Sequence, residues 1–299
     1  MISEGCGVFK QKSRNYGTSV RIYHSFEDWR CLSGDAFRTV AVGFVPTMGA
    51  LHDGHASLIR RARQELGQDG HVVVSIYVNP TQFNDAVDFQ TYPKTRDADV
   101  KLSEDAGADA VVFPRSDELY PNGVPERPEP VDYGVLTSHW EAVHRRGHFD
   151  GVVAVVRSLF RQVRPERVYF GEKDWQQLAV ISEMVCRESL DLTVVPVSTA
   201  REPSGLAMSS RNVRLDSQER GAAALLHTAL RFVAAAGGTQ ESVDLQTAVL
   251  CARGWVVEYL AVVDAVTLED TADFARPRRV IAAGFLGGVR LIDNLGISY

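Results

Sequence analysis

The sequence predicts an α/β protein in which a doubly wound parallel sheet is followed by a second, smaller α+β domain. Short apolar runs alternate with amphipathic helical patterns over the first two thirds of the chain, which is the rhythm of strand–helix–strand units. These runs are apolar on both faces, as strands covered by helices on both sides require. A chain of 299 residues also exceeds the size at which a single core keeps growing.

The first domain, residues 1–199, is expected to hold strands at 40–47, 71–78, 109–114, 167–171 and 192–197. Helices are expected between them, where apolar residues recur at three- and four-residue spacing, at 54–66, 97–106, 151–163 and 174–188. The proline-rich stretch YPNGVPERPEPVDYG (120–134) predicts a loop. Parallel strands alternating with helices make this domain Rossmann-like. We expect about the first 20 residues to be loosely ordered.

The rhythm changes at STAREPSG (198–205), and we place a domain boundary near residue 199. Residues 200–299 predict a long alanine-rich helix near 217–236, a second helix, and strands at 257–264, 278–285 and 288–294. Helices followed by a run of strands indicate a separate α+β domain.

The charge, the cysteines and the apolar runs indicate which partners and which cellular location to expect. The formal net charge is −6, whereas proteins that bind nucleic acids normally carry a basic surface, so no nucleic-acid partner is expected. The cysteines are scattered without a CxxC pair, which fits reduced thiols in the cytoplasm; they are Cys6, Cys31, Cys186 and Cys251. Nowhere do about 18 apolar residues run together, so neither a membrane span nor a membrane partner is expected.

The stretch VPTMGALHDGH (45–55) follows the first strong strand and opens a helix. Ligands bind at this edge of parallel α/β sheets, and the free N–H groups of a helix N-terminus suit a phosphate. His52 and His55 would then donate hydrogen bonds to phosphoryl oxygens. Two other interpretations stay open from spacing alone: a metal pair, although no third ligand has suitable spacing, or a helix-capping turn with incidental histidines.

Two further polar stretches fit the same chemistry. GEKDWQQ (171–177) lies where a strand passes into a helix, so Lys173 could reach phosphates, Asp174 could cap the helix, and Gln177 would face the same cleft. LAMSSRN (206–212) combines two serines with an arginine that can fork onto two phosphate oxygens. Each stretch is also compatible with an ordinary solvated helix start or loop.

A fourth stretch, VNPTQFN (78–84), ends another strand, and the amide of Gln82 suits a substrate with hydroxyl and carboxylate groups. Downstream, Asp97 and Asp99 are interpreted either as acids at a helix start or as carboxylates that serve Mg²⁺ beside a triphosphate. The pattern alone does not decide between the two.

Taken together, these motifs resemble the pantoate–β-alanine ligase family. Between about residues 40 and 294 the chain carries, in the family's order, PTMGALHDGH, VNPTQF, YPKT, GHFDGV, YFGEKDWQQL, GLAMSSRN and RLIDN. The HxGH pattern with a later MSSR also resembles the wider nucleotidyltransferase superfamily, in which the two motifs bracket ATP. The resemblance implies that pantoate attacks the α-phosphorus of ATP and releases pyrophosphate. The amine of β-alanine then attacks the bound pantoyl adenylate, giving pantothenate and AMP.

The resemblance also implies roles for individual residues. It makes His55 the proton donor, His52 a stabiliser of the phosphoryl transition state, and Lys173 a cation on the transferring phosphate. The implied ATP site comprises Met48, Gly49, Ala50, Leu51, His52, Asp53, Gly54, His55, Gly171, Glu172, Lys173, Asp174, Ala200, Met208, Ser209, Ser210 and Arg211. Gln82 and Gln177 would hold pantoate, with Gln82 also touching β-alanine, and Asp99 is the implied Mg²⁺ ligand.

The same resemblance implies a lid and an assembly. The second domain would close over the phosphates with its MSSR segment and keep water from the adenylate. The family's usual state implies a homodimer. The chain departs from the family at Arg146, Lys94 and Ala98, which puts the metal contact and the local loop geometry in question more than the activity.

Two other functions compete with this one. A related enzyme that transfers adenylate to a phosphorylated acceptor would need more cations where Gln82 and Gln177 stand. A catalytically inactive nucleotide-binding regulator would have lost His55 or Lys173, and both are present.

Overall fold

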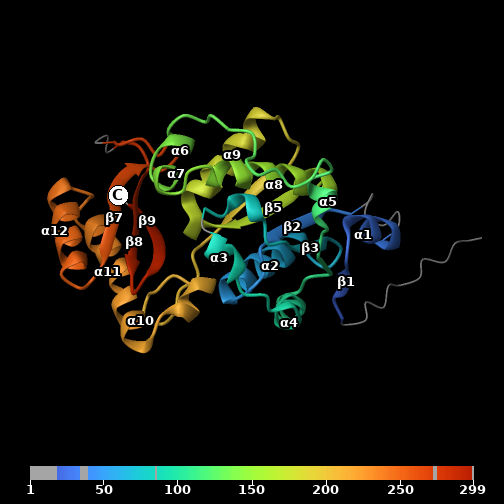
Figure 1. Cartoon of the computed structure of the whole chain (residues 1–299), viewed down its shortest axis with the longest axis horizontal. Coiled ribbons are helices and arrows are strands. Elements are labelled where there is room, and N and C mark those ends of the chain that lie inside the picture. Colours follow the sequence, from blue (N-terminus) through green and yellow to red (C-terminus); the bar gives the residue numbers. More distant parts are fainter. Residues whose placement is uncertain (1–18, 34–39, 85, 272–274, 298–299) are drawn as a thin grey trace, which may run out of the picture.

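The computed structural model describes residues 19–33, 40–84, 86–271 and 275–297. Over these residues the chain forms two sheets, one with six parallel strands and one with three antiparallel strands (Figure 1). The larger sheet has the order β1-β4-β3-β2-β5-β6, so β2 and β5 lie side by side although they are far apart in the sequence. The fold class predicted from the sequence is confirmed. Most of the segment expected to be loosely ordered lies outside the described residues.

The strands of the larger sheet match the predicted ones, with one addition. They are β1 (Arg21–Tyr23), β2 (Val42–Thr47), β3 (His71–Ile76), β4 (Ala110–Val112), β5 (Arg167–Gly171) and β6 (Thr193–Val197). The sequence did not predict β1, because Tyr23 alone of its three residues is buried and so the strand leaves no apolar run. This strand pairs with β4 at the edge of the sheet.

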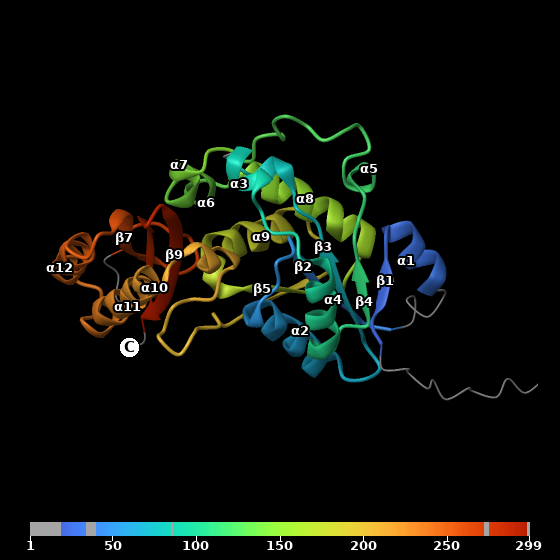
Figure 2. The ribbon, with the colours of Figure 1, turned by 60° about the horizontal axis from the view of Figure 1, so that its bottom comes forward.

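Helices cover both faces of this sheet (Figure 2). One face carries α2 (Asp53–Leu66) and α4 (Arg96–Ala106), and the other carries α8 (His148–Val163) and α9 (Trp175–Arg187). Phe44 of β2 packs into the core beneath α8 and α9, while its neighbour Val45 packs into the core beneath α2. Burial on both faces explains why the strands appear in the sequence as continuous apolar runs.

Short helical segments occupy the connections, and several of them shape the cavity described below. They are α1 (Phe26–Ser33), η2 (Pro80–Gln82), α3 (Ala86–Gln90), α5 (Ser116–Leu119), α6 (Val135–Ser138), α7 (Glu141–His144), η3 (Glu172–Asp174) and η4 (Ser210–Arg214). Between α5 and α6 the proline-rich stretch 121–133 contains neither helix nor strand, as predicted.

The smaller sheet and three helices form the carboxy-terminal part of the described chain. Its elements are α10 (Ser217–Ala223), α11 (Leu225–Ala235), α12 (Gln240–Cys251), β7 (Val256–Asp264), β8 (Arg278–Leu286) and β9 (Val289–Ile297). The prediction of one long helix near 217–236 was wrong, because the helix breaks at Ala224. There the Ala224 amide donates to the carbonyl of Ala222, two residues back rather than the four of an α-helix, and the Trp255 indole donates to the same carbonyl at 3.3 Å. None of the described helices is long and apolar enough to cross a membrane.

Candidate active site

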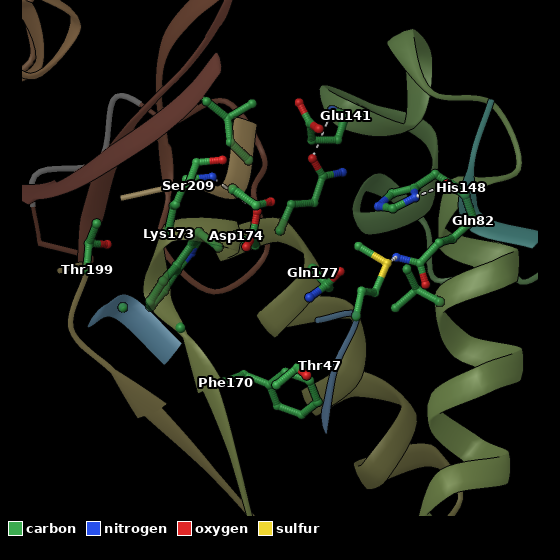
Figure 3. Close-up of a pocket in the computed structure, with 18 of the residues that line it drawn as sticks. Thr47, Gln82, Glu141, His148, Phe170, Lys173, Asp174, Gln177, Thr199 and Ser209 are labelled. Carbon is green, nitrogen blue, oxygen red and sulfur yellow. Dashed lines mark hydrogen bonds and ion pairs between the residues drawn. The ribbon is translucent and has the colours of Figure 1, made fainter. Parts of the chain in front are cut away.

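A cavity of about 250 Å³ lies at the carboxyl ends of β2 and β5, and the smaller sheet closes its far side. Figure 3 shows Lys173, Asp174 and Ser209 on one side of the hollow, Gln82 and His148 on the other, and Gln177 between them. Most residues proposed from the sequence line it: Met48, His52, Gly54, His55, Gln82, Gly171, Lys173, Asp174, Gln177, Ala200, Met208, Ser209, Ser210 and Arg211. The lining does not include Gly49, Ala50, Leu51, Asp53, Asp99 or Glu172.

The turn after β2 is held in place by Asp99. Gly49 and Ala50 both have positive φ, at +85° and +50°, a conformation that is strained for alanine. The buried Asp99 carboxylate accepts hydrogen bonds from the Ala50 amide (3.1 Å), the Leu51 amide (2.7 Å) and the Thr95 hydroxyl (3.0 Å). These bonds favour the interpretation of Asp99 as a structural acid near a helix start over that of a Mg²⁺ ligand.

The two histidines form the N-terminal cap of α2. Nδ1 of His52 accepts a hydrogen bond from the Gly54 amide (3.1 Å), and Nδ1 of His55 accepts one from the His52 amide (3.2 Å). Their ring centroids lie 4.2 Å apart. A Cβ atom at Gly54 would stand 2.8 Å from the His52 ring, so this arrangement requires glycine. His52 and His55 therefore both cap the helix and line the cavity.

Both rings are neutral donors at physiological pH. Burial and then the charge of Lys173 lower the pKa of His52 to about 4. Burial, His52 and Lys173 lower the pKa of His55 to about 3. Because each Nδ1 accepts from a backbone amide, the single proton of each ring is on Nε2. Each ring can thus donate this N–H to a phosphoryl oxygen in the cavity that it lines.

Lys173 lies on the turn between β5 and α9, with its Nζ 3.7 Å from Oδ1 of Asp174. The side-chain amide of Asn294, on β9, donates to the backbone carbonyls of Glu172 (2.8 Å) and Lys173 (2.9 Å). The smaller sheet therefore fixes the lysine turn. Asp174 occupies the N-cap position of α9, but the prediction that it caps the helix was wrong. Its carboxylate makes no capping hydrogen bond and lines the cavity instead.

Gln82 is held from several sides at the end of η2. Its amide nitrogen lies 3.1 Å from the sulfur of Met48, and its amide oxygen accepts from Asn79 at 3.1 Å. Helix α8 approaches the same turn at Gly151, where a Cβ atom would stand 2.4 Å from the carbonyl oxygen of Thr81. The absence of a side chain at Gly151 lets the helix support the turn that presents Gln82.

The Ser209–Arg211 segment, at the start of η4, reaches the cavity from the connection between β6 and α10. The Met208 amide donates to the Ala200 carbonyl at 2.9 Å, and the Ser209 hydroxyl accepts from the Arg211 amide at 3.3 Å. Ser210 meets Tyr92 of the first part, with hydroxyl oxygens 3.5 Å apart. Polar groups of this segment thus line the same cavity as those of the turns after β2 and β5.

Residues 21–296 match the family model described as pantoate-beta-alanine ligase. The chain belongs to this family. A pantothenate synthetase from Rubrobacter xylanophilus is 45% identical, covering 86% of this chain and 91% of its own length. One from Bdellovibrio bacteriovorus is 43% identical, covering 93% and 98%. The fold and the activity predicted from the resemblance are confirmed: this is an ATP-dependent ligase of pantothenate biosynthesis that forms an amide bond between pantoate and β-alanine.

Solved structures agree with the assignment. Pantothenate synthetase from Thermus thermophilus is 40% identical and superposes with a TM-score of 0.83, covering 94% of this ligase and 100% of its own chain. The ligase from Francisella tularensis, solved in complex with beta-gamma ATP and β-alanine, is 32% identical with a TM-score of 0.77, covering 93% and 98%.

Sequence reasoning missed a buried charge network beside the cavity of the ligase. Glu141 of α7 receives two hydrogen bonds from Arg290 of β9, at 2.9 and 2.6 Å, and one from the Tyr259 hydroxyl at 2.7 Å. Burial acts to raise the pKa of Glu141, but the hydrogen bonds and charge of Arg290 outweigh it and hold the pKa at about 2. The partners are 149 residues apart, so no local motif could indicate this contact.

His148 was also missed, although the motif GHFDGV contains it. Burial and then the charge of Arg145 lower its pKa to about 3, so the ring is neutral. Its Nε2 lies 3.0 Å from a guanidinium nitrogen of Arg145, which can only donate, so the ring proton is on Nδ1 and points to the Gln82 carbonyl at 2.9 Å. His148 thereby connects Arg145 to the glutamine turn, which is η2 with Gln82 at its end.

The described ranges contain no group of three or more His, Cys, Asp or Glu side chains arranged to hold a metal ion. A metal pair at His52 and His55 therefore has no third ligand of these types, and each Nδ1 is already engaged by a backbone amide. The geometry favours phosphate chemistry at this turn.

Proposed function

We propose that this ligase condenses (R)-pantoate with β-alanine in this cavity, through an enzyme-bound pantoyl adenylate, and releases AMP and pyrophosphate. The observation that carries the proposal is that two neutral imidazole donors, a lysine and two glutamines line one hollow; they are His52, His55, Lys173, Gln82 and Gln177. Nucleotidyl transfer needs reactants to be positioned and negative charge to be stabilised, and these groups serve both needs.

In the first step, the amides of Gln82 and Gln177 hold pantoate with its carboxylate toward the α-phosphorus of ATP. A bond forms between the carboxylate oxygen and phosphorus while the bond to pyrophosphate breaks. Negative charge grows on the phosphoryl oxygens, where Nε2–H of His52 and of His55 and the ammonium of Lys173 stabilise it. With a pKa of about 3, His55 acts as a neutral hydrogen-bond donor rather than as an acid that gives up its proton.

In the second step, the amine of β-alanine attacks the acyl carbon and AMP leaves. The adenylate is an activated mixed anhydride, so water must be excluded until the amine arrives. We assign this task to residues 200–299 as a lid, with the boundary near 199 and with Met208–Arg211 over the phosphates. The backbone at Ala200 would meet the adenine.

Three further features belong to the proposal. Mg²⁺ would enter with the ATP phosphates, which supply the oxygen ligands that this ion prefers; Asp174 is the cavity-lining carboxylate beside Lys173 that could join them. We infer a homodimer from the family resemblance. The scattered cysteines without a CxxC pair support a cytoplasmic location.

The test is pyrophosphate release from Mg²⁺-ATP with pantoate alone, followed by addition of β-alanine. We expect about one pyrophosphate per active site with pantoate alone, and steady formation of AMP and pantothenate only when β-alanine is present. Absence of pantoate-dependent pyrophosphate would refute the proposed reaction.

A further inference from the structure

Asp88, on the short helix α3, bridges two arginines of η4. Its Oδ2 accepts from Nη2 of Arg211 at 2.8 Å, and its Oδ1 accepts from Nη1 of Arg214 at 3.1 Å. Asp88 and Arg211 are about one-quarter exposed, at 26% and 29%, while Arg214 is half exposed. One carboxylate of α3 thus pairs with two cations of η4, of which only Arg211 belongs to the MSSR motif.

The position of α3 links Asp88 to the pantoate side of the cavity. Phe83 follows Gln82 directly and packs edge-on against Phe89 at 5.3 Å and Tyr92 at 5.7 Å. Asp88 therefore lies on a segment whose aromatic side chains pack together next to the glutamine turn. This packing holds the segment that carries Asp88 in place independently of the Asp88 carboxylate.

The two arginines differ in what they face. Arg211 lines the catalytic cavity and also a second hollow of about 300 Å³ beside it, whereas Arg214 lines the second hollow alone. Asp88 is the one described side chain to which the Arg211 guanidinium is hydrogen bonded, and it takes a single nitrogen of the group. The other guanidinium N–H groups stay available for a phosphate while this nitrogen is anchored.

Resting on the proposed function, we propose that Asp88 is a positioning residue for nucleotide binding: it anchors one edge of the Arg211 guanidinium so that the other edge is presented to the ATP phosphates. Arg214 strengthens the anchor by holding the second carboxylate oxygen. An unanchored arginine would have to give up its rotamer freedom on binding, which weakens the contact.

Asp88→Asn keeps the shape of the side chain and removes its charge. We expect a rise in the KM for ATP on the order of tenfold in steady-state pyrophosphate release with both pantoate and β-alanine present, with the KM for pantoate within about twofold of the original value. Asp88→Glu restores the carboxylate and is expected to recover most of the affinity for ATP. Arg214→Gln is expected to have a smaller effect than Asp88→Asn, because Arg211 keeps its own hydrogen bond.

Asp117→Asn is the matched control, since it removes a solvent-exposed carboxylate that pairs with Arg115 away from the cavity. It is expected to leave both KM values unchanged. An Asp88→Asn variant with the original KM for ATP would overturn the inference, and so would a lower KM, which would make Asp88 a competitor of the phosphates. A loss of folded protein with unchanged KM values would make the role merely structural and would also overturn it. Failure of the unsubstituted enzyme to release pyrophosphate would instead refute the proposed function.

Discussion

Asp99→Asn is expected to destabilise the ligand-free protein and to leave unchanged the dependence of its activity on the Mg²⁺ that we propose enters with ATP. The carboxylate is 2% exposed and holds the turn that contains the positive-φ residues Gly49 and Ala50. An asparagine oxygen could still accept from the Leu51 amide and the Thr95 hydroxyl, which share Oδ1. Its NH₂ group would then face the Ala50 amide, now 3.1 Å from Oδ2, donor against donor.

The magnitude follows from that mismatch. A buried donor without an acceptor costs about 1–3 kcal/mol, and the remaining bonds lose the assistance of a full charge. We therefore expect the free energy of unfolding to fall by about 2–3 kcal/mol, which lowers the melting temperature by roughly 3–5 °C in a chain of this size.

The assay combines thermal unfolding without nucleotide and pyrophosphate release over a magnesium titration. Asp97→Asn is the control, because Asp97 is an exposed acid on the same helix and should leave stability almost unchanged. If Asp99→Asn keeps the original melting temperature but needs much more magnesium for activity, our reasoning is refuted and Asp99 serves the metal.

Three other outcomes are expected. His55→Ala or Lys173→Ala should lower turnover on the order of 10²-fold, the scale of losing one transition-state donor; near-normal turnover of either folded variant would contradict its role. Gly151→Ala places a Cβ 2.4 Å from a backbone oxygen of η2, so we expect a loss of roughly 1–3 kcal/mol in denaturant unfolding and a higher KM for pantoate; unchanged values would rule out a close approach here. Glu141 has a folded pKa of about 2, below its ordinary value of 4.5, so its contribution to stability is complete above pH 4.5 and lost as the pH falls toward 2. Glu141→Gln should flatten that acid limb in unfolding measured from pH 6 to 3, and an unaltered slope would count against the Arg290 pairing.

Local sequence predicted the strands well because each strand carries its own signal. The run HVVVSIYV is apolar on both faces, and the structure buries it between two layers of helices. β1 could not be predicted in this way, since its pairing with β4 rather than its own composition defines it. The break at Ala224 was equally hidden, because the Trp255 indole that donates to the Ala222 carbonyl there lies 33 residues from Ala222.

The candidate site likewise has features that a local motif indicates and features that depend on distant residues. Motifs at strand ends predicted many of the residues that line the cavity, because parallel strands bring their carboxyl ends to one edge. What each polar group bonds to could not be predicted. Asp99 reaches a turn 48 residues earlier in the chain, and Glu141 of α7 meets Arg290 of β9. Those contacts depend on packing between distant segments, which a local sequence pattern does not indicate.

The hydrogen bonds from Asn294 bear on the order in which the lysine turn gains its support while the chain is being synthesised. The lysine turn is complete in sequence at Asp174, yet the amide that holds its carbonyls is added 121 residues after Lys173. A growing chain on the ribosome therefore carries Lys173 and its turn long before it carries the strand that holds the carbonyls of that turn. Asn294 lies on β9, which pairs with β8, so fragments that stop short of Asn294 lack this support for the lysine turn.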